Sequence, residues 1–341
     1  MSLPWVGGDG GYSVSTVQAA HPRCEVVQAK LIRNSSRQHL PCSERTAVLV
    51  KRMIDLCTSL SDIRQASLRI APYIHRTPVV TSQALNRISG RTLYFKCENL
   101  QKAGAFKIRG ATNAVLGIPA LVAQRGVVTH SSGNHGQAVA LAARNAGLKA
   151  YVVMPRDAPS VKRKAVAEYG AEIVYCEPNL WARAQATDEV VQKTGATFIS
   201  PYDDAAVIAG QGTLGLELME QTSAIDAVVV PIGGGGLVSG LAVAIKSLRP
   251  DIQVIAAEPK GADDSAQSLA RGQRVSMEDP KSLADGLLVN LGALTWPIVQ
   301  SHVAKVITVS EVEIVFAMRL VWERLKLIIE PSSAVAVAAV L

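Results

Sequence analysis

The sequence has few cysteines and no long hydrophobic run. Its five cysteines are odd in number and include no C-x-x-C pair, which argues against a disulfide framework and against a zinc site. No apolar run reaches the length that spans a membrane. The first residues, MSLPWVGGDGGYSVS, lack the basic start and the apolar core of a secretory signal. We therefore expect a reduced, cytoplasmic protein that does not enter a membrane.

Concentrated charge is absent as well. The net charge is +7, from 35 Lys and Arg against 28 Asp and Glu, but no basic block or basic–aromatic run occurs. A nucleic-acid partner is therefore not expected, whereas a mild positive excess suits small anionic ligands. Aromatic residues make up only 4% of the chain and apolar residues 48%. This composition favours a globular protein built from buried strands and helices.

Two parts of the chain differ in pattern. Residues 1–58 show little periodicity and are interpreted as an N-terminal extension, in which only RTAVLVKRMIDLC (45–57) could form a short helix. The chain becomes periodic from residue 59, and Ser61 is the expected N-cap of the first helix. The expected strands are 92–98, 126–130, 150–155, 172–177, 227–232 and 253–259. Strands that alternate with glycine-rich turns and helices predict an α/β fold, with mostly parallel sheets covered by helices on both faces.

Four consecutive glycines, Gly233 to Gly236, lie between a buried strand and a helix. Glycine lets backbone N–H groups approach an oxyanion, and the N-terminus of the following helix adds a favourable dipole. A tight turn with close strand–helix packing would also use glycine. A run of four favours a phosphate cradle.

Two motifs that bind nucleotides do not match this loop. A dinucleotide fingerprint needs a third glycine where Val238 or Ser239 stands. A Walker A loop needs a lysine after Gly240, where the sequence has leucine. Glu258 does end the next strand, as a ribose-binding acid would, so an NAD-dependent dehydrogenase stays open as an alternative. The loop itself predicts a site for a single phosphate.

The segment AGAFKIRGATNAV (103–115) places Lys107 among small and apolar residues instead of on a polar helix face. Pyridoxal phosphate (PLP) carries one phosphate and forms a Schiff base with a lysine, after which its ring withdraws electrons. An apolar setting suits this lysine because burial lowers the pKa of its amine. Lys107 and the glycine loop together predict PLP as the cofactor.

A third segment, THSSGNHGQAVA (129–140), turns from a strand into a helix through small polar side chains. Ser131 and Ser132 can donate hydrogen bonds to a carboxylate or exchange a proton, and Asn134 can hydrogen-bond a phenolic oxygen. The helix N-terminus also favours an anion. An ordinary helix capped by serine or asparagine explains this segment equally well when it is taken alone.

Six segments carry a resemblance to a known family. They are FKCENLQKAGAFKIRGA, SSGNHGQA, AGQGT, PIGGGGLVSG, AAEPKGADD and IEPSSA, in this order. Together they resemble the fold-type II PLP-dependent enzymes of the serine racemase and serine–threonine dehydratase family, over about residues 60–341. The resemblance implies a two-domain fold similar to the tryptophan synthase β subunit. The large PLP-binding domain would comprise 59–125 and 204–341, and a small domain of 126–203 would close over the substrate.

The resemblance also implies roles for single residues. Lys107 would bind PLP and act as the base on one face of the substrate Cα, and Ser132 would exchange a proton on the opposite face. Phe106 would pack near the cofactor ring, and Asn134 would hydrogen-bond its 3′-oxygen. The phosphate would be held by Gly233, Gly234, Gly235 and Gly236. The substrate would be surrounded by Ser131, Ser132, Asn134, His135 and, in the closed form, Arg183.

Two further sites follow from the resemblance. A divalent cation (Mg²⁺, Ca²⁺ or Mn²⁺) would be bound by Glu258, the Ala262 carbonyl and Asp264, which form an all-oxygen set. The segment EPKGADD alone is typical of a solvated acidic loop. An ATP effector site between the subunits of a homodimer would include Gln137, Tyr169 and Lys326.

The implied activity is the interconversion of L- and D-serine, with dehydration of serine to pyruvate and ammonia. A threonine or threo-3-hydroxyaspartate dehydratase is the alternative. Ala105 and Tyr202 stand where animal members of the family carry serine and asparagine, which leaves the balance of the two reactions open. The family pattern also continues past Leu341 to a last core strand and a Ser-Gly-Gly-Asn turn, whose serine binds the PLP pyridine nitrogen. A catalytically impaired form that binds PLP weakly or pairs with a longer chain is therefore a further alternative.

Overall fold

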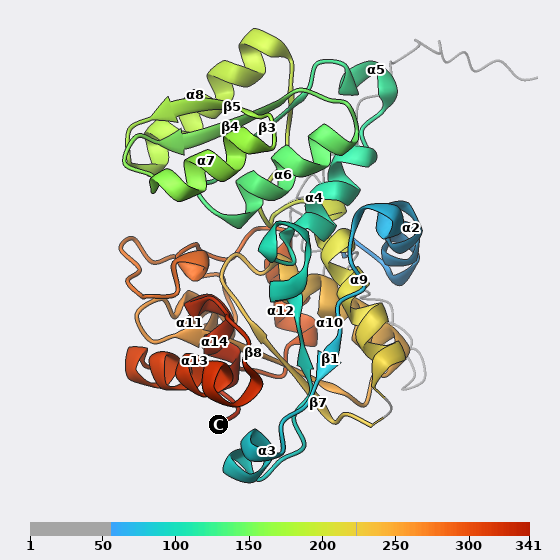
Figure 1. Cartoon of the computed structure of the whole chain (residues 1–341), viewed down its shortest axis with the longest axis vertical. Helices are drawn as coiled ribbons and strands as arrows, with labels where there is room; N and C mark the ends of the chain where they lie inside the picture. The colour runs from blue at the N-terminus through green and yellow to red at the C-terminus, as the bar shows by residue number, and fades with distance from the viewer. Residues whose placement is uncertain (1–55, 223) are drawn as a thin grey trace, which may run out of the picture. The chain divides into compact units, whose positions relative to one another are not determined.

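The computed structural model describes residues 56–222 and 224–341 (Figure 1). This part of the chain folds into a four-stranded and a three-stranded parallel sheet, a two-stranded antiparallel pair and the surrounding helices. The predicted α/β class, with mostly parallel sheets and helices on both faces, is confirmed. The short helix predicted at 45–57 lies almost entirely outside the described residues.

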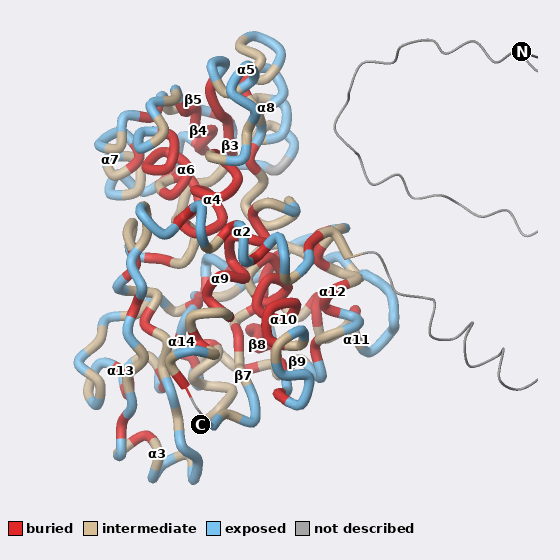
Figure 2. Tube along the Cα trace, turned by 90° about the vertical axis from the view of Figure 1, so that its right-hand side faces the viewer, coloured by how far each residue is buried: buried red, intermediate tan, exposed pale blue. Residues whose placement is uncertain are grey.

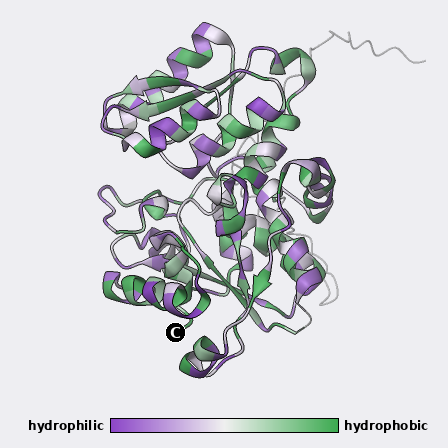
Figure 3. Ribbon diagram, viewed as in Figure 1, coloured by the Kyte–Doolittle hydropathy of each residue, from purple (hydrophilic) through white to green (hydrophobic). Residues whose placement is uncertain are grey.

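The four-stranded sheet is covered on both faces. Its strands are β3 (Val127–His130), β4 (Ala150–Pro155), β5 (Glu172–Cys176) and β6 (Thr197–Phe198), in the order β5-β4-β3-β6. The covering helices are α6 (Asn134–Asn145), α7 (Ser160–Glu168) and α8 (Leu180–Thr194). Val152 packs in one cluster with Val166 of α7, whereas Val153 packs in another with Val190 of α8. Every residue of β4 is buried, as expected for an inner parallel strand, and the strands are mainly hydrophobic in Figure 3.

The three-stranded sheet is covered in the same way. Its strands are β7 (Ala227–Pro231), β8 (Gln253–Pro259) and β9 (Lys305–Val309), in that order. The helices on one face are α9 (Ala205–Gln221), α10 (Gly236–Leu248) and α12 (Thr295–His302), and those on the other are α13 (Glu311–Leu325) and α14 (Pro331–Ala338). Val254 and Ala256 of β8 pack toward the first group, and Ala257 packs toward the second.

The other elements are shorter. They are α2 (Leu60–Ile70), η1 (Ala71–Tyr73), β1 (Val79–Val80), α3 (Gln83–Ser89), β2 (Phe95–Lys96), η2 (Glu98–Leu100), η3 (Lys102–Gly104), α4 (Lys107–Leu116), α5 (Ala120–Ala123), α11 (Asp264–Arg271) and η4 (Asp285–Leu287). The predicted N-cap Ser61 is wrong. Ser59 caps α2 instead, because it forms a reciprocal capping box with Asp62.

The strand predicted at 92–98 is much shorter than expected. It is reduced to β2, after which the chain turns into η2 at Glu98. Within the described residues no helix has the length and apolar composition needed to cross a bilayer. The four-stranded sheet lies within 127–198 and the three-stranded sheet within 227–309, so we keep the two-domain division as a proposal.

Candidate active site

Lys107 is the first residue of α4, and its amine has no charged partner among the residues that the structure describes. The Lys107 Nζ donates a hydrogen bond to the carbonyl oxygen of Pro201 at 2.7 Å and lies 5.3 Å from the centre of the Phe106 ring. Burial lowers the pKa of the Lys107 amine from 10.5 to about 8, because a neutral carbonyl does not compensate for the lost hydration. About one tenth of this amine is therefore neutral, and nucleophilic, at pH 7.

The glycine loop joins β7 to α10 and is closely packed on one side. A Cβ on Gly234 would lie 2.2 Å from the Tyr202 ring, and a Cβ on Gly235 would lie 2.8 Å from Thr295. Gly235 also has a φ of +89°, a left-handed conformation that favours glycine. Close packing therefore explains part of the glycine run, as the alternative interpretation proposed. The first N–H groups of α10 nevertheless have no side-chain cap and can donate to an anion.

Residues 201 and 202 lie between the amine and the glycine loop. The Pro201 carbonyl accepts the Lys107 hydrogen bond, and Tyr202 contacts the loop at both Gly234 and Gly236. A desolvated amine and a row of N–H donors with no acceptor among the described residues thus lie next to the same dipeptide. These residues fit PLP, whose aldehyde requires such an amine and whose phosphate requires such donors. The part played by Pro201 was not predicted, because a backbone carbonyl leaves no signature in the sequence.

The serine loop connects β3 to α6 and ends beside Lys107. Ser131 Oγ accepts a hydrogen bond from Gly133 N at 3.2 Å, and Ser132 is half-buried. His135 is buried, and its Nε2 lies 3.2 Å from the Ile199 carbonyl oxygen, whereas its Nδ1 has no hydrogen-bond partner. Burial, with the charge of Lys107 as a second cause, lowers the His135 pKa to about 3. Because the charge of Lys107 acts on His135, the N-terminal part of α6 lies close to the amine.

Asn134 begins α6 and contacts a carboxylate that the sequence analysis did not assign. The Asn134 Nδ2 donates to both carboxylate oxygens of Glu330, each at 2.9 Å. Glu330 lies just before α14, within the IEPSSA segment that contributed to the resemblance. That segment was the available signal, but its spacing along the chain does not reveal a contact with residue 134.

A cleft of about 290 Å³ opens beside Tyr202. Its lining includes His130, Pro201, Tyr202, Arg274 and Asn290. Arg183 of α8 does not line this cleft, although burial and the Arg183 charge together lower the pKa of His130. The buried Nε of Arg183 has no hydrogen-bond partner. Arg183 therefore lies near His130, and no hydrogen bond joins it to the serine loop within the described residues.

The predicted cation ligands Glu258 and Asp264 are both buried. The Glu258 carboxylate accepts hydrogen bonds from the N–H groups of Ser265 and Ala266, at 3.3 and 2.6 Å. Burial raises the pKa of Glu258 to about 8, with the charge of Asp264 adding to the effect, and burial raises the pKa of Asp264 to about 6. The Ser265 hydroxyl is buried without a partner. Two buried carboxylates and a hydroxyl oxygen without a hydrogen-bond partner are the kind of oxygen ligands that a hard cation prefers. The described residues nevertheless hold no group of three or more His, Cys, Asp or Glu arranged around a metal.

The residues assigned to the ATP site are separated among the elements. Gln137 lies on α6, Tyr169 caps the C-terminus of α7, and exposed Lys326 caps α13 in a left-handed conformation. The guanidinium of Arg144 lies 5.1 Å from the centre of the Tyr169 ring. No hydrogen bond or ion pair joins the three predicted residues within the described chain.

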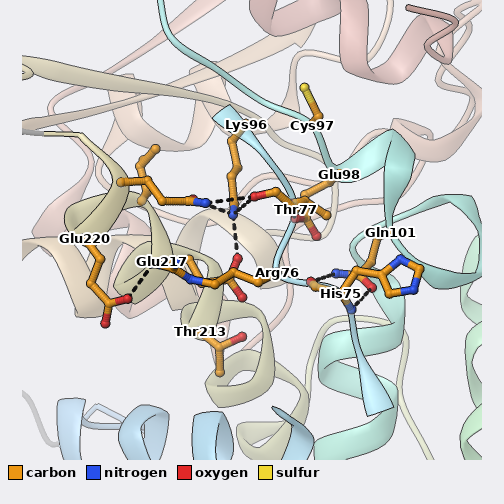
Figure 4. Close-up of polar contacts among 12 residues, drawn as sticks. His75, Arg76, Thr77, Lys96, Cys97, Glu98, Gln101, Thr213, Glu217 and Glu220 are labelled. Atoms are coloured by element: carbon orange, nitrogen blue, oxygen red, sulfur yellow. Dashed lines mark hydrogen bonds and ion pairs between the residues drawn. The ribbon is translucent and has the colours of Figure 1, made fainter. Parts of the chain in front are cut away.

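A buried ion cluster lies behind Lys107 on α4, and the sequence analysis did not predict it. Arg109 is fully buried and donates to Glu98 at 2.8 and 2.9 Å and to Glu217 at 2.7 and 3.0 Å. Lys96 also donates to Glu217 and to the carbonyl oxygen of Thr77 (Figure 4). Burial alone would lower the pKa of Arg109, but the two carboxylates reverse that effect and raise it. The cluster joins β2, η2, α4 and α9.

Comparison with known proteins gives one consistent result. The pattern of the family described as pyridoxal-phosphate-dependent enzyme matches residues 70–341. A serine racemase of Arabidopsis thaliana is 53% identical over 279 residues, which cover 82% of this chain and 84% of that protein. A beta-hydroxyaspartate dehydratase of Paracoccus denitrificans is 49% identical, covering 82% and 89%. The solved structure of maize serine racemase superposes with a TM-score of 0.83 at 48% identity, covering 84% and 87%.

Proposed function

Because the chain belongs to the pyridoxal-phosphate-dependent enzyme family, and is an enzyme of the racemase and lyase type, we propose that it interconverts L- and D-serine and also dehydrates serine. The observation that carries this proposal is the desolvated Lys107 amine beside the uncapped N-terminus of α10. Relatives named serine racemase, at 53% identity, support the substrate.

The residues of the chain would divide the work as follows. PLP, when bound, would withdraw electrons from the substrate Cα. Lys107, whose amine is partly neutral near pH 8, would remove or return the α-proton on one face. Ser132 would do the same on the other face. Phe106 would pack against the cofactor ring, and the N–H groups of Gly233 to Gly236 would hold its phosphate.

The remaining polar residues would orient the substrate. Ser131 and Asn134 lie at the N-terminus of α6, where the helix dipole favours a carboxylate. Neutral His135 has its Nδ1 free to donate or accept a hydrogen bond. We propose that the segment 126–203, which carries both α8 and the serine loop, closes over the site and brings Arg183 to the substrate.

Ser132→Ala is the sharpest test of the two-face scheme. Racemisation requires a proton group on each face, so the variant is expected to lose racemisation by about 100-fold or more. Dehydration of L-serine requires only one face and is expected to change much less. D-serine formation and pyruvate release are measured in the same reaction. Equal loss of both reactions would contradict the role of Ser132.

A second activity has a specific observation in its favour. The relative from Paracoccus denitrificans, 49% identical, is named beta-hydroxyaspartate dehydratase, so dehydration of 3-hydroxyaspartate or threonine is the alternative. The rates with serine, threonine and both threo-3-hydroxyaspartate enantiomers separate these possibilities. A specificity constant for a hydroxyaspartate far above that for serine would replace the first proposal by the second.

We propose further that Mg²⁺, Ca²⁺ or Mn²⁺ binds at Glu258, the Ala262 carbonyl and Asp264. A cation at 100 times its dissociation constant is expected to stabilise the folded protein by about 2.7 kcal/mol, seen as a higher unfolding temperature. Glu258→Gln should remove the shift. Asp263→Asn, one residue from Asp264, is the matched control and should keep it. The same shift in both variants would place the cation elsewhere.

A homodimer with ATP as effector completes the proposal. The helix α13 exposes Val312, Phe316 and Trp322, at 78%, 55% and 66% of their surface, which is an unusual concentration of large apolar side chains. We propose that Gln137, Tyr169 and Lys326 come together only between two copies. Light scattering that shows a monomer at working concentration would contradict the homodimer. Serine turnover that does not respond to ATP would contradict the effector site.

A further inference from the structure

Three helices begin at the candidate site, and one of them, α9, packs against the other two. Lys107 is the first residue of α4, Gly236 is the first residue of α10, and α9 begins three residues after Tyr202. In Figure 2 these helices are among the most buried parts of the chain. The amine and the phosphate-binding N–H groups are therefore carried by two different helices, and α9 contacts both.

The contact between α4 and α9 leaves no room for a side chain. A Cβ on Gly210 would lie 2.6 Å from the Gly110 Cα and 2.7 Å from the Arg109 carbonyl oxygen. Both are backbone atoms, which cannot move aside as a flexible side chain can. Gln211 adds a hydrogen bond, because its Oε1 accepts from the Gly110 N–H at 3.2 Å. This contact lies one helical turn after Lys107.

The contact between α9 and α10 is equally close. A Cβ on Gly240 would lie 2.3 Å from the Ile208 carbonyl oxygen and 2.5 Å from the Gly212 nitrogen, again backbone atoms. Gly240 is one helical turn after Gly236. Each crossing therefore lies about 4.5 to 6 Å from the functional end of its helix, since a helix rises 1.5 Å per residue.

The two contacts use opposite sides of α9 at nearly the same height. Gly210 and Gly212 are two residues apart, which corresponds to about 200° around the helix and about 3 Å along it. The helices α4 and α10 consequently pack on either side of α9. The distance between α4 and α10 is therefore set by two contacts in which backbone atoms lie close together. Arg109 strengthens the first contact through its ion pair with Glu217 of α9.

Resting on the function proposed above, we propose that α9 sets the distance between the Lys107 amine and the glycine loop, through its backbone contacts with α4 at Gly210 and with α10 at Gly212. PLP needs its aldehyde and its phosphate bound at once, so this distance is part of the binding site. The glycines of the AGQGT segment are then positioning residues, although they touch neither the cofactor nor the substrate.

The test measures binding of the phosphate end and of the aldehyde end of the cofactor separately. Pyridoxine 5′-phosphate has no aldehyde, so its dissociation constant reports the phosphate end alone. With PLP, the Lys107 amine condenses with the aldehyde and releases water, and borohydride then reduces the C=N bond to a stable product. The yield of this product on Lys107, located by mass mapping at short exposure, reports the amine end.

The two glycine variants should each impair a different readout. Gly210→Ala displaces α4 and is expected to lower the rate of trapping on Lys107 by about 100-fold, as a misplacement of about 1 Å does. Its affinity for pyridoxine 5′-phosphate should stay near the wild-type value. Gly240→Ala displaces α10 and should weaken pyridoxine 5′-phosphate about tenfold or more, because N–H bonds to the phosphate are lost. Glu220→Ala is the control, since Glu220 lies later on α9 and its side chain is 66% exposed. It should leave both readouts unchanged.

The failures are distinguishable. Variants that change both readouts by the same factor, or neither, would overturn the role of α9 while PLP binding by the wild type still stood. A wild type that neither binds pyridoxine 5′-phosphate nor is trapped would overturn the proposed function and this inference with it. If the alanine variants do not fold, Gln211→Ala decides, because it removes the bond to Gly110 without adding atoms. Unchanged trapping in that variant would contradict the proposal that the contact with α4 positions Lys107.

Discussion

Lys107→Ala is expected to abolish the covalent attachment of PLP and to lower both serine reactions by about 10,000-fold or more. The variant removes the amine that both binds the cofactor and moves the α-proton, and no other lysine contacts Pro201 in the described chain. Absorbance of the PLP-loaded protein, borohydride trapping and serine turnover are the three measurements. The glycine loop is untouched, so affinity for pyridoxine 5′-phosphate should remain.

Lys102→Ala provides the control for this experiment. Lys102 lies five residues earlier, in η3, and makes no side-chain hydrogen bond to the site in the described structure. The Lys102→Ala variant should be trapped with PLP on Lys107, and it should turn over serine at the wild-type rate. Retained turnover in Lys107→Ala, or trapping on a different lysine, would refute the assignment of the cofactor amine.

Glu217→Gln is expected to cost about 3 kcal/mol of unfolding free energy, because it breaks a buried ion pair. Glu217 accepts hydrogen bonds from Arg109 and Lys96, and its side chain is only 13% exposed. Burial alone would raise the pKa of Glu217, but the two cations outweigh burial and lower it. Removing the carboxylate leaves Arg109 and Lys96 with Glu98 as the one remaining counter-charge. Urea unfolding measures the loss.

The same helix supplies a matched control. Glu220 of α9 pairs with Arg76 at 2.7 Å, but the two side chains are 66% and 54% exposed. Glu220→Gln should therefore cost less than about 1 kcal/mol, because water and salt screen an exposed pair. Similar losses in the two variants would mean that burial of the cluster around Arg109 has no energetic consequence.

Local patterns predicted the strands and turns that carry the candidate site, because these elements are local. The glycine loop, Lys107 and the serine loop each lie where a strand or a turn enters a helix, and that transition is visible in a few consecutive residues. The strand 253–259 was predicted with its observed bounds for the same reason. Buried strands between glycine-rich turns leave a signal that survives without tertiary information.

Contacts between distant segments could not be predicted in this way. Glu330 lies 196 residues from Asn134, and Pro201 acts through a carbonyl that every residue possesses. The strand expected at 92–98 failed because Glu98 turns into η2 and pairs with Arg109 instead of continuing the sheet. The N-cap moved from Ser61 to Ser59 because Asp62 completes a capping box only with Ser59. Each of these outcomes depends on a partner that spacing alone does not specify.

The cluster around Arg109 also constrains how this sequence can change over generations. It contains two cations, Arg109 and Lys96, and two carboxylates, Glu98 and Glu217, in an interior that tolerates little net charge. A single replacement of Lys96 or Glu217 leaves an unmatched charge, whereas neutralising both together does not. We therefore expect positions 96 and 217 to vary jointly among related chains, and such paired variation would trace the cluster where no structure exists.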